Sequence, residues 1–175
     1  MQREIITTSD GSKTIQIKDW NEQYHSKHGA IQEAYHVFIK HGLSLFKNES
    51  ISILEIGFGT GLNALISLLE APNHCLNIEY TGVEAYPIKK DELRQLNYIT
   101  ELKADVFAEH FKLMHQSSWE EKIYISDYFQ LKKQKSDFRE IEADNIFDLV
   151  YFDAFGARQS DHRARCRHAF GNRIA

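Results

Sequence analysis

The sequence has few cysteines and no long hydrophobic run. Its two cysteines, Cys75 and Cys166, form no CxxC pair, which excludes a disulfide scaffold and favours a reducing compartment. No apolar run approaches the ~18 residues of a membrane-spanning helix, and the N-terminus does not resemble a signal peptide. We therefore expect a soluble, cytoplasmic protein.

An excess of positive charge is also lacking. The formal net charge of −4 provides no overall attraction to nucleic acid, so an RNA substrate would have to be held by local patches. Two lysine clusters are candidates, Lys89 with Lys90 and Lys132 with Lys133 and Lys135, although such runs are also typical of solvated faces. The histidines lack cysteines or paired acids at metal-ligand spacing, and neither a P-loop nor a nucleophile elbow is present. No metal site is expected.

The apolar residues predict one packed α/β domain. At 175 residues, with 42% hydrophobic and 12% aromatic content, the chain can form a single core. Its patterns predict strands at residues 51–56, 78–83, 119–125 and 147–152, and helices at 62–69 and from 87 to about 115. This alternation is typical of a parallel sheet with right-handed crossovers. A β-hairpin at 4–17 and an amphipathic helix at 31–46 come first, and the segment 130–144 is too charged for the core.

A glycine-rich turn follows the first of these strands. Gly57, Gly59 and Gly61 allow positive φ angles and leave no Cβ between a ligand and the backbone, while the next helix presents its positive end. A dinucleotide fingerprint needs glycine at the sixth position, which is Leu62 here, so an NAD site is disfavoured. The G-x-G-x-G form, with Glu55 ahead of it, resembles motif I of the Rossmann-like S-adenosylmethionine-dependent methyltransferases.

Acids stand at the expected ends of the other three strands. Glu84 can accept both hydroxyls of a cofactor ribose, because each carboxylate oxygen accepts one hydrogen, and Asp127 can meet the adenine amino group. Either acid could instead cap a helix. Asp153 is expected beside the methyl acceptor, where it would orient an amine and accept its proton, since a nearby carboxylate raises an amine's pKa. Phe152 and Phe155 could wall the acceptor or belong to the core.

An ordered set of motifs extends along most of the chain: Tyr24-His25-Ser26, Gly29-Ala30, Glu33, His36-Val37-Phe38, the loop from Gly57 to Asn63, Glu84-Ala85-Tyr86-Pro87 and Phe152-Asp153-Ala154-Phe155. With these motifs the chain resembles, from about residue 5 to residue 156, the tRNA wobble-uridine methyltransferases of the MnmC/MnmD type. The resemblance implies methyl transfer from S-adenosylmethionine to the amine of 5-aminomethyl-2-thiouridine in tRNA, giving the 5-methylaminomethyl form. It also implies an oxidoreductase that acts on the same nucleoside.

The resemblance assigns roles to individual residues. Asp153 matches the catalytic acid that faces the substrate amine, and Tyr24, Glu33 and Phe155 match residues of the pocket. The expected cofactor-binding residues are Glu55, Gly57, Gly59, Gly61, Asn63, Glu84 and Asp127.

The chain departs from the family after residue 157. The family continues with a proline-containing loop and strands five to seven, whereas residues 158–175 contain five arginines, no lysine and no apolar periodicity. We expect an incomplete Rossmann-like sheet of strands one to four only, with an exposed apolar edge. The predicted organisation is an N-terminal hairpin and helix (1–48), a partial S-adenosylmethionine-binding domain (49–157) and an anomalous tail (158–175), which is either a frameshifted or truncated reading frame or a basic arm.

Four hypotheses remain open from the sequence. The chain is an active tRNA amine methyltransferase, a truncated non-catalytic remnant of that enzyme, a methyltransferase for a small amine, or an NAD-linked oxidoreductase. An acidic surface suits the third, and Leu62 opposes the fourth.

Overall fold

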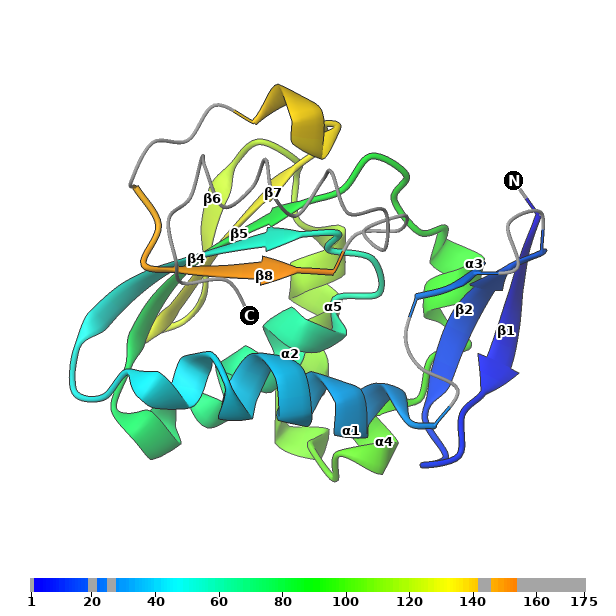
Figure 1. Ribbon diagram of the computed structural model, residues 1–175, viewed down its shortest axis with the longest axis horizontal. Helices are drawn as coiled ribbons and strands as arrows, with labels where there is room; N and C mark the ends of the chain where they lie inside the picture. Colours follow the sequence, from blue (N-terminus) through cyan, green and yellow to red (C-terminus); the bar gives the residue numbers. More distant parts are fainter. Residues whose placement is uncertain (1, 19–21, 25–27, 142–145, 154–175) are drawn as a thin grey trace.

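The computed structural model of the protein describes residues 2–18, 22–24, 28–141 and 146–153. These residues form a five-stranded main sheet and a separate three-stranded small sheet. Figure 1 shows helices gathered on one side of the main sheet, with the small sheet beside one end of it. The predicted tail, residues 158–175, and Phe155 lie outside the described residues.

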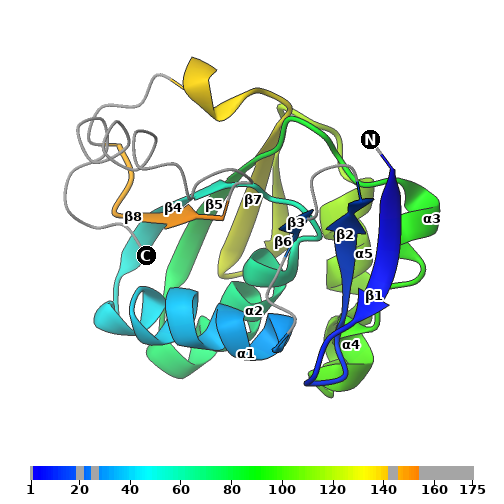
Figure 2. The same cartoon turned by 45° about the vertical axis from the view of Figure 1, so that its right-hand side comes forward.

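The small sheet contains the predicted hairpin. Strands β1 (Arg3–Thr7) and β2 (Lys13–Ile17) pair antiparallel, with Arg3 opposite Ile17, and the two-residue strand β3 (Glu22–Gln23) adds to β2. The turn closes with a hydrogen bond from the Thr8 N–H to the Ser12 carbonyl. Figure 2 shows that this sheet stands next to the short helix α3 (Lys90–Leu93).

The main sheet has the order β6-β7-β5-β4-β8. Four of its strands run parallel: β4 (Ser50–Ile56), β5 (Asn77–Val83), β7 (Phe129–Gln134) and β8 (Leu149–Phe152). The fifth, β6 (Lys122–Ser126), lies at the edge and runs antiparallel to β7. The first, second and fourth predicted strands are confirmed in place, and so is the α/β class.

The sequence-based prediction fails at the third strand. Residues near 119–125 form the antiparallel edge strand β6, so the sheet is neither wholly parallel nor limited to four strands. The segment 130–144, which we expected to lie outside the core, contributes β7 between β6 and β5. Phe129, Leu131 and Lys133 are buried there and alternate with half-buried residues. Alternation of side chains along a strand makes this charged segment compatible with the sheet, because the aliphatic part of a lysine can be buried while its ammonium contacts a polar partner.

Helices cover one face of the main sheet. The predicted helix 62–69 is confirmed as α2 (Leu62–Glu70). The predicted helix 31–46 is α1 (Ala30–Ala34), which continues as one π-helical segment (Tyr35–Lys40) and a 3-10 turn (Leu43–Leu45). The helical region after Pro87 is divided into α3, α4 (Tyr98–Glu101), a 3-10 turn (Asp105–Phe107) and α5 (Ala108–Gln116).

Two apolar cores result from this layering. The larger lies between the sheet and α1, α2 and α5, and it contains Phe38, Tyr80 and Tyr151. The smaller lies on the opposite face, where Leu54, Ile56, Val83, Val150 and Phe152 pack against Phe138 of a further 3-10 turn (Phe138–Glu140). Among the helices described, none is long and apolar enough to cross a membrane. Since four strands are parallel, their carboxyl ends meet at one edge, where the polar residues discussed next are found.

Candidate functional site

The glycine loop connects β4 to α2 at the carboxyl edge of the sheet. Gly57, Gly59 and Gly61 have φ angles of 92°, 50° and 73°. The N–H groups of Gly57 and Phe58 both donate to the Val83 carbonyl at the end of β5, at 2.9 and 3.0 Å. A Cβ on Gly59 would lie 2.8 Å from Cδ1 of Tyr24, so this position accepts only glycine without a shift of the ring. The loop is therefore held in one shape by its neighbours.

Glu84 binds the glycine loop to the segment after β5. Its side chain is buried, one carboxylate oxygen accepts the Gly59 N–H at 2.9 Å, and the other accepts the Tyr86 N–H at 2.7 Å. The next helix, α3, begins only at Lys90, so Glu84 is not a helix cap. Each carboxylate oxygen still has a free lone pair for a ligand hydroxyl.

A second polar cluster, which we call the acid cluster, consists of Glu55, Asn63 and Asp153. The Asn63 Nδ2 group donates to Glu55 Oε1 and to Asp153 Oδ2, both at 2.8 Å, and so joins β4, α2 and the end of β8. The buried atoms Glu55 Oε2 and Asn63 Oδ1 have no hydrogen-bond partner among the described residues. The Tyr80 hydroxyl, which interacts with Glu55, is also buried and has no partner within hydrogen-bond distance among the described residues. The two buried acceptors still outnumber this one donor, which favours a ligand that brings hydrogen-bond donors or positive charge.

The acid cluster alters the pKa values of its own carboxyl groups. Burial raises the pKa of Asp153 to about 8, the Asn63 hydrogen bond opposes this shift, and the charges of Glu33 and Glu84 reinforce it. Burial, with the Asp153 charge, likewise raises the pKa of Glu55 well above its usual range. A cation bound here would lower both pKa values, because it favours the ionised carboxylates.

A cavity of about 140 Å³ lies at the carboxyl ends of the strands, and both Glu84 and Asp153 line it. Tyr24 and Gly57 also line it, together with residues 136–138 from the segment after β7. Tyr24 lies under the Arg3 guanidinium, 5.8 Å from its ring centre, and burial raises its pKa above the usual value. The structure thus brings Tyr24 beside the predicted cofactor and substrate residues, and Glu33 acts on Asp153 through its charge.

Asp127 is the one predicted site residue that the structure contradicts. It lies in the turn between β6 and β7, and Phe129 pairs with Ile78 near the start of β5. Asp127 is therefore at the amino edge of the parallel strands, opposite the glycine loop, and its predicted contact with adenine is wrong. The carboxyl end of β7 instead brings Asp137 and Phe138 to the cavity, in a segment that the sequence analysis had excluded from the core.

Asp137 and Phe152 have structural roles. The Arg139 guanidinium bonds both carboxylate oxygens of Asp137, at 2.9 and 2.6 Å, and lowers the Asp137 pKa to about 2. Phe152 is buried in the smaller core, 6.0 Å from the Phe138 ring, so it is a core residue and not a wall of the cavity.

Residues that no sequence motif indicates support the glycine loop from the helical side. His115 Nε2 lies 3.2 Å from the Thr60 carbonyl, and the Tyr98 hydroxyl donates to Thr60 Oγ1 at 3.0 Å. Burial, with the charge of Lys133, lowers the His115 pKa to about 4, so the ring is neutral and its Nε2–H can donate to Thr60. These residues come from α4 and α5, and no local pattern in those helices points to the loop.

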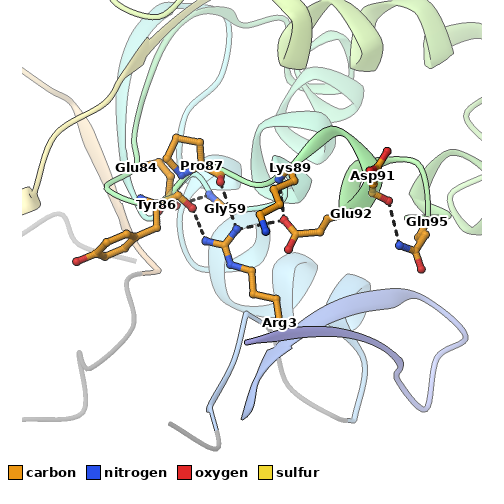
Figure 3. A network of polar contacts seen from close by, with 9 residues as sticks. All are labelled: Arg3, Gly59, Glu84, Tyr86, Pro87, Lys89, Asp91, Glu92 and Gln95. Carbon is orange, nitrogen blue, oxygen red and sulfur yellow. Dashed lines mark hydrogen bonds and ion pairs between the residues drawn. The ribbon is translucent and has the colours of Figure 1, made fainter. Parts of the chain in front are cut away.

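Arg3, which no sequence motif indicates either, binds the segment after Glu84 from the small sheet (Figure 3). Its guanidinium donates to the carbonyls of Tyr86 and Pro87 at 2.5 and 3.2 Å, and pairs with Glu92 at 3.1 Å. Glu92 also accepts the Lys89 N–H at 2.6 Å. The first residue of β1 therefore positions the backbone that adjoins the candidate cofactor site.

Comparisons with known proteins show what the chain is similar to. No family model matches the sequence. Curated relatives from Burkholderia mallei (strain SAVP1) and Burkholderia pseudomallei (strain K96243) are each named "tRNA 5-methylaminomethyl-2-thiouridine biosynthesis bifunctional protein MnmC". Each is 37% identical to this chain over 97 residues, which is 52% of this chain but only 14% of the relative.

A solved structure extends the similarity to most of the chain. The structure of MnmC2 from Aquifex aeolicus matches with a TM-score of 0.67 at 30% identity, over 88% of this chain and 50% of that one. The predicted resemblance to the MnmC/MnmD type and the Rossmann-like class are thereby confirmed.

Proposed function

We propose that this MnmC-related chain is an S-adenosylmethionine-dependent N-methyltransferase that converts 5-aminomethyl-2-thiouridine to 5-methylaminomethyl-2-thiouridine at the tRNA wobble position. The observation that carries the proposal is the acid cluster, in which Asn63 joins Asp153 and Glu55 beside the glycine loop. Similarity to MnmC supports a role in tRNA modification.

The residues present fit S-adenosylmethionine. Gly57 lines the cavity and presents backbone without a Cβ to it. The unpartnered acceptors Glu55 Oε2 and Asn63 Oδ1 suit the ammonium of its amino-acid part, and the lone pairs left on Glu84 suit its ribose hydroxyls. When bound, the cofactor supplies an electrophilic methyl group on a sulfonium.

Asp153 then acts on the acceptor amine. An amine must lose its proton before it can attack a methyl carbon, and Asp153, whose pKa burial raises, is the carboxylate in the cavity that can accept this proton. The Asn63 bond holds Asp153 Oδ2 in place, which orients the amine that Asp153 binds. Tyr24 and Phe138 provide aromatic walls that exclude water from the cavity.

Methyl transfer to tRNA tests the proposal. The assay uses labelled S-adenosylmethionine and tRNA that carries 5-aminomethyl-2-thiouridine, with nucleoside analysis of the product. We expect the mono-methylated amine in the wild type and a large loss with Asp153→Ala. Calorimetric titration should show binding of S-adenosylmethionine and none of NAD. Unchanged transfer by Asp153→Ala, or preference for NAD, would contradict the proposal.

A small-amine methyltransferase is the second candidate, because a chain with a net charge of −4 does not attract nucleic acid as a whole. Competition between modified tRNA and free aminomethyl nucleoside in the same assay separates the two. The curated relatives are named bifunctional, which supports a second activity in the same modification. For the tRNA enzyme we further propose that this activity is an oxidoreductase acting on the same nucleoside, and that the enzyme is cytoplasmic.

A further inference from the structure

A groove separate from the acid cluster runs along the outer side of the candidate cofactor site. It has a volume of about 570 Å³ and lies between β1 and the segment after β5. Gln2, Arg3, Tyr86, Lys89, Glu92 and Lys135 line it. Ala85 and Tyr86 line both this groove and the cavity that contains Asp153, so the two spaces adjoin.

The charge of the groove is positive although the chain is acidic. Arg3 and Glu92 neutralise one another, at 3.1 Å and with little exposure. Lys89 and Lys135 are exposed, and neither ammonium forms an ion pair or hydrogen bond with the residues that the structure describes. They come from two sequence clusters, 46 residues apart, and only the fold brings them together. Lys133, their neighbour in sequence, is buried instead and donates to the His115 carbonyl at 3.0 Å.

Tyr86 presents an aromatic ring on a backbone that is fixed on both sides. Its N–H donates to Glu84 and its carbonyl accepts from Arg3, while its side chain is 57% exposed. Figure 3 shows the ring extending away from the Arg3 guanidinium. An exposed aromatic ring and two lysines that line one groove form a combination that suits single-stranded nucleic acid, because bases can stack on the ring and phosphates can approach the ammonium groups.

We propose that this groove holds the RNA strand next to the nucleotide whose base enters the Asp153 cavity, with Lys89 and Lys135 at phosphates and Tyr86 under a base. The proposal rests on the proposed function, since it supplies the local grip that an acidic enzyme needs for tRNA. Charge complementarity favours RNA over a neutral partner. The Arg3 hydrogen bonds join the two sides of the groove, β1 and the segment after β5.

Binding of RNA without cofactor tests the groove. The probe is a fluorescein-labelled anticodon stem-loop, and its anisotropy is measured against protein over a range of salt concentrations. We expect Lys89→Ala/Lys135→Ala to weaken binding roughly tenfold or more and to reduce the slope of log affinity against log salt by about 1.4, the value for two phosphates of a single strand. Tyr86→Ala should weaken binding at least fivefold, roughly, with the salt slope unchanged.

The matched control is a variant that also removes two lysine charges, but at positions outside the groove. Lys40 and Lys47 are exposed and precede β4, away from its carboxyl end, so Lys40→Ala/Lys47→Ala should leave affinity unchanged. Equal losses in the two double variants, no RNA binding by the wild type, or equal competition by polyglutamate or inorganic phosphate would overturn the proposal. The two hypotheses fail separately: methylation of modified tRNA without groove-dependent RNA binding would contradict only the groove, and groove-dependent RNA binding without methylation would contradict only the proposed function.

Discussion

The glycine loop and the acid cluster adjoin at the carboxyl edge of the sheet, but their polar groups are satisfied to different degrees. The loop has partners from several elements: Val83, Glu84 and His115 make hydrogen bonds that fix its backbone. The acid cluster has two carboxyl groups, one shared amide donor and two buried acceptors without described partners. The hydrogen-bonding groups of the glycine loop are paired within the protein, whereas the acid cluster keeps acceptors that a ligand's donors could pair with.

The difference has an energetic meaning. Hydrogen bonds to the loop stabilise the folded protein whether or not a ligand is present. Unpaired buried acceptors and raised carboxyl pKa values destabilise the unliganded protein and strengthen the binding of donors and cations. Mutations in the loop should therefore lower stability, and mutations in the acid cluster should lower activity without lowering stability.

The largest expected effect is on catalysis. Asp153→Asn keeps the shape of the side chain but removes the proton acceptor, so methyl transfer to the modified tRNA should fall by roughly 10²-fold or more. Single-turnover transfer at saturating S-adenosylmethionine measures this loss. Asp105→Asn, at an exposed acid in a 3-10 turn, is the control and should behave as the wild type. Near-normal transfer by Asp153→Asn would show that the acid cluster does not take part in methyl transfer.

The pH dependence of stability should separate the two regions next. The Asp153 pKa is about 8 in the folded protein and about 3.9 when unfolded, so the folded state binds more protons between these values. Its contribution to stability is complete below about pH 4 and is lost as the pH rises to about 8. The unfolding free energy of the unliganded protein in urea should fall over this range, and Asp153→Asn should flatten the decline. Identical slopes in variant and wild type would show that the acid is not buried in this way.

In the loop, Gly59→Ala should destabilise the protein by about 2 kcal/mol, because alanine is strained at a φ of 50° and its Cβ would meet the Tyr24 ring at 2.8 Å. Urea denaturation measures the change. The same substitution in a Tyr24→Ala background should cost less, since the clash is then absent. An equal penalty in both backgrounds would mean that backbone strain alone is responsible.

A smaller loss is expected from Glu84→Gln. The amide keeps one acceptor oxygen, so either the Gly59 or the Tyr86 N–H loses its partner, which should cost about 1–2 kcal/mol. Glu79→Gln is the control, because Glu79 forms an exposed ion pair with Lys122 and its loss should cost only a few tenths of a kcal/mol, about 0.3. Equal stability of the two variants would contradict the role of Glu84 in joining the glycine loop to the segment after β5.

Which candidate site residues lie near one another could be predicted where neighbours in sequence decide neighbours in space. Glu55 precedes the glycine turn and Asn63 follows it, at the second position of α2, so the turn itself brings the two side chains together. Glu84 and Asp153 follow strands that pair with β4 on either side, and parallel pairing places their ends at the same edge.

The prediction failed where strand direction and distant contacts decide. Asp127 also follows a strand, but β6 runs antiparallel, so its end points to the opposite edge. Chain direction in a sheet depends on which strand becomes the neighbour, and the sequence alone did not show that β7 lies between β6 and β5. The support from Arg3, His115 and Tyr98 depends on packing between elements far apart in the chain.

The sequence by itself determined the α/β class, the G-x-G-x-G loop and the acids that flank it, because these follow from hydrophobic period and local backbone freedom. Only the tertiary structure decided that Asp127 is excluded, that Asp137 and Phe138 reach the cavity, and that Lys89 and Lys135 share a groove. The physical reason is that side-chain chemistry is local, whereas proximity across a sheet is set by pairing order and direction.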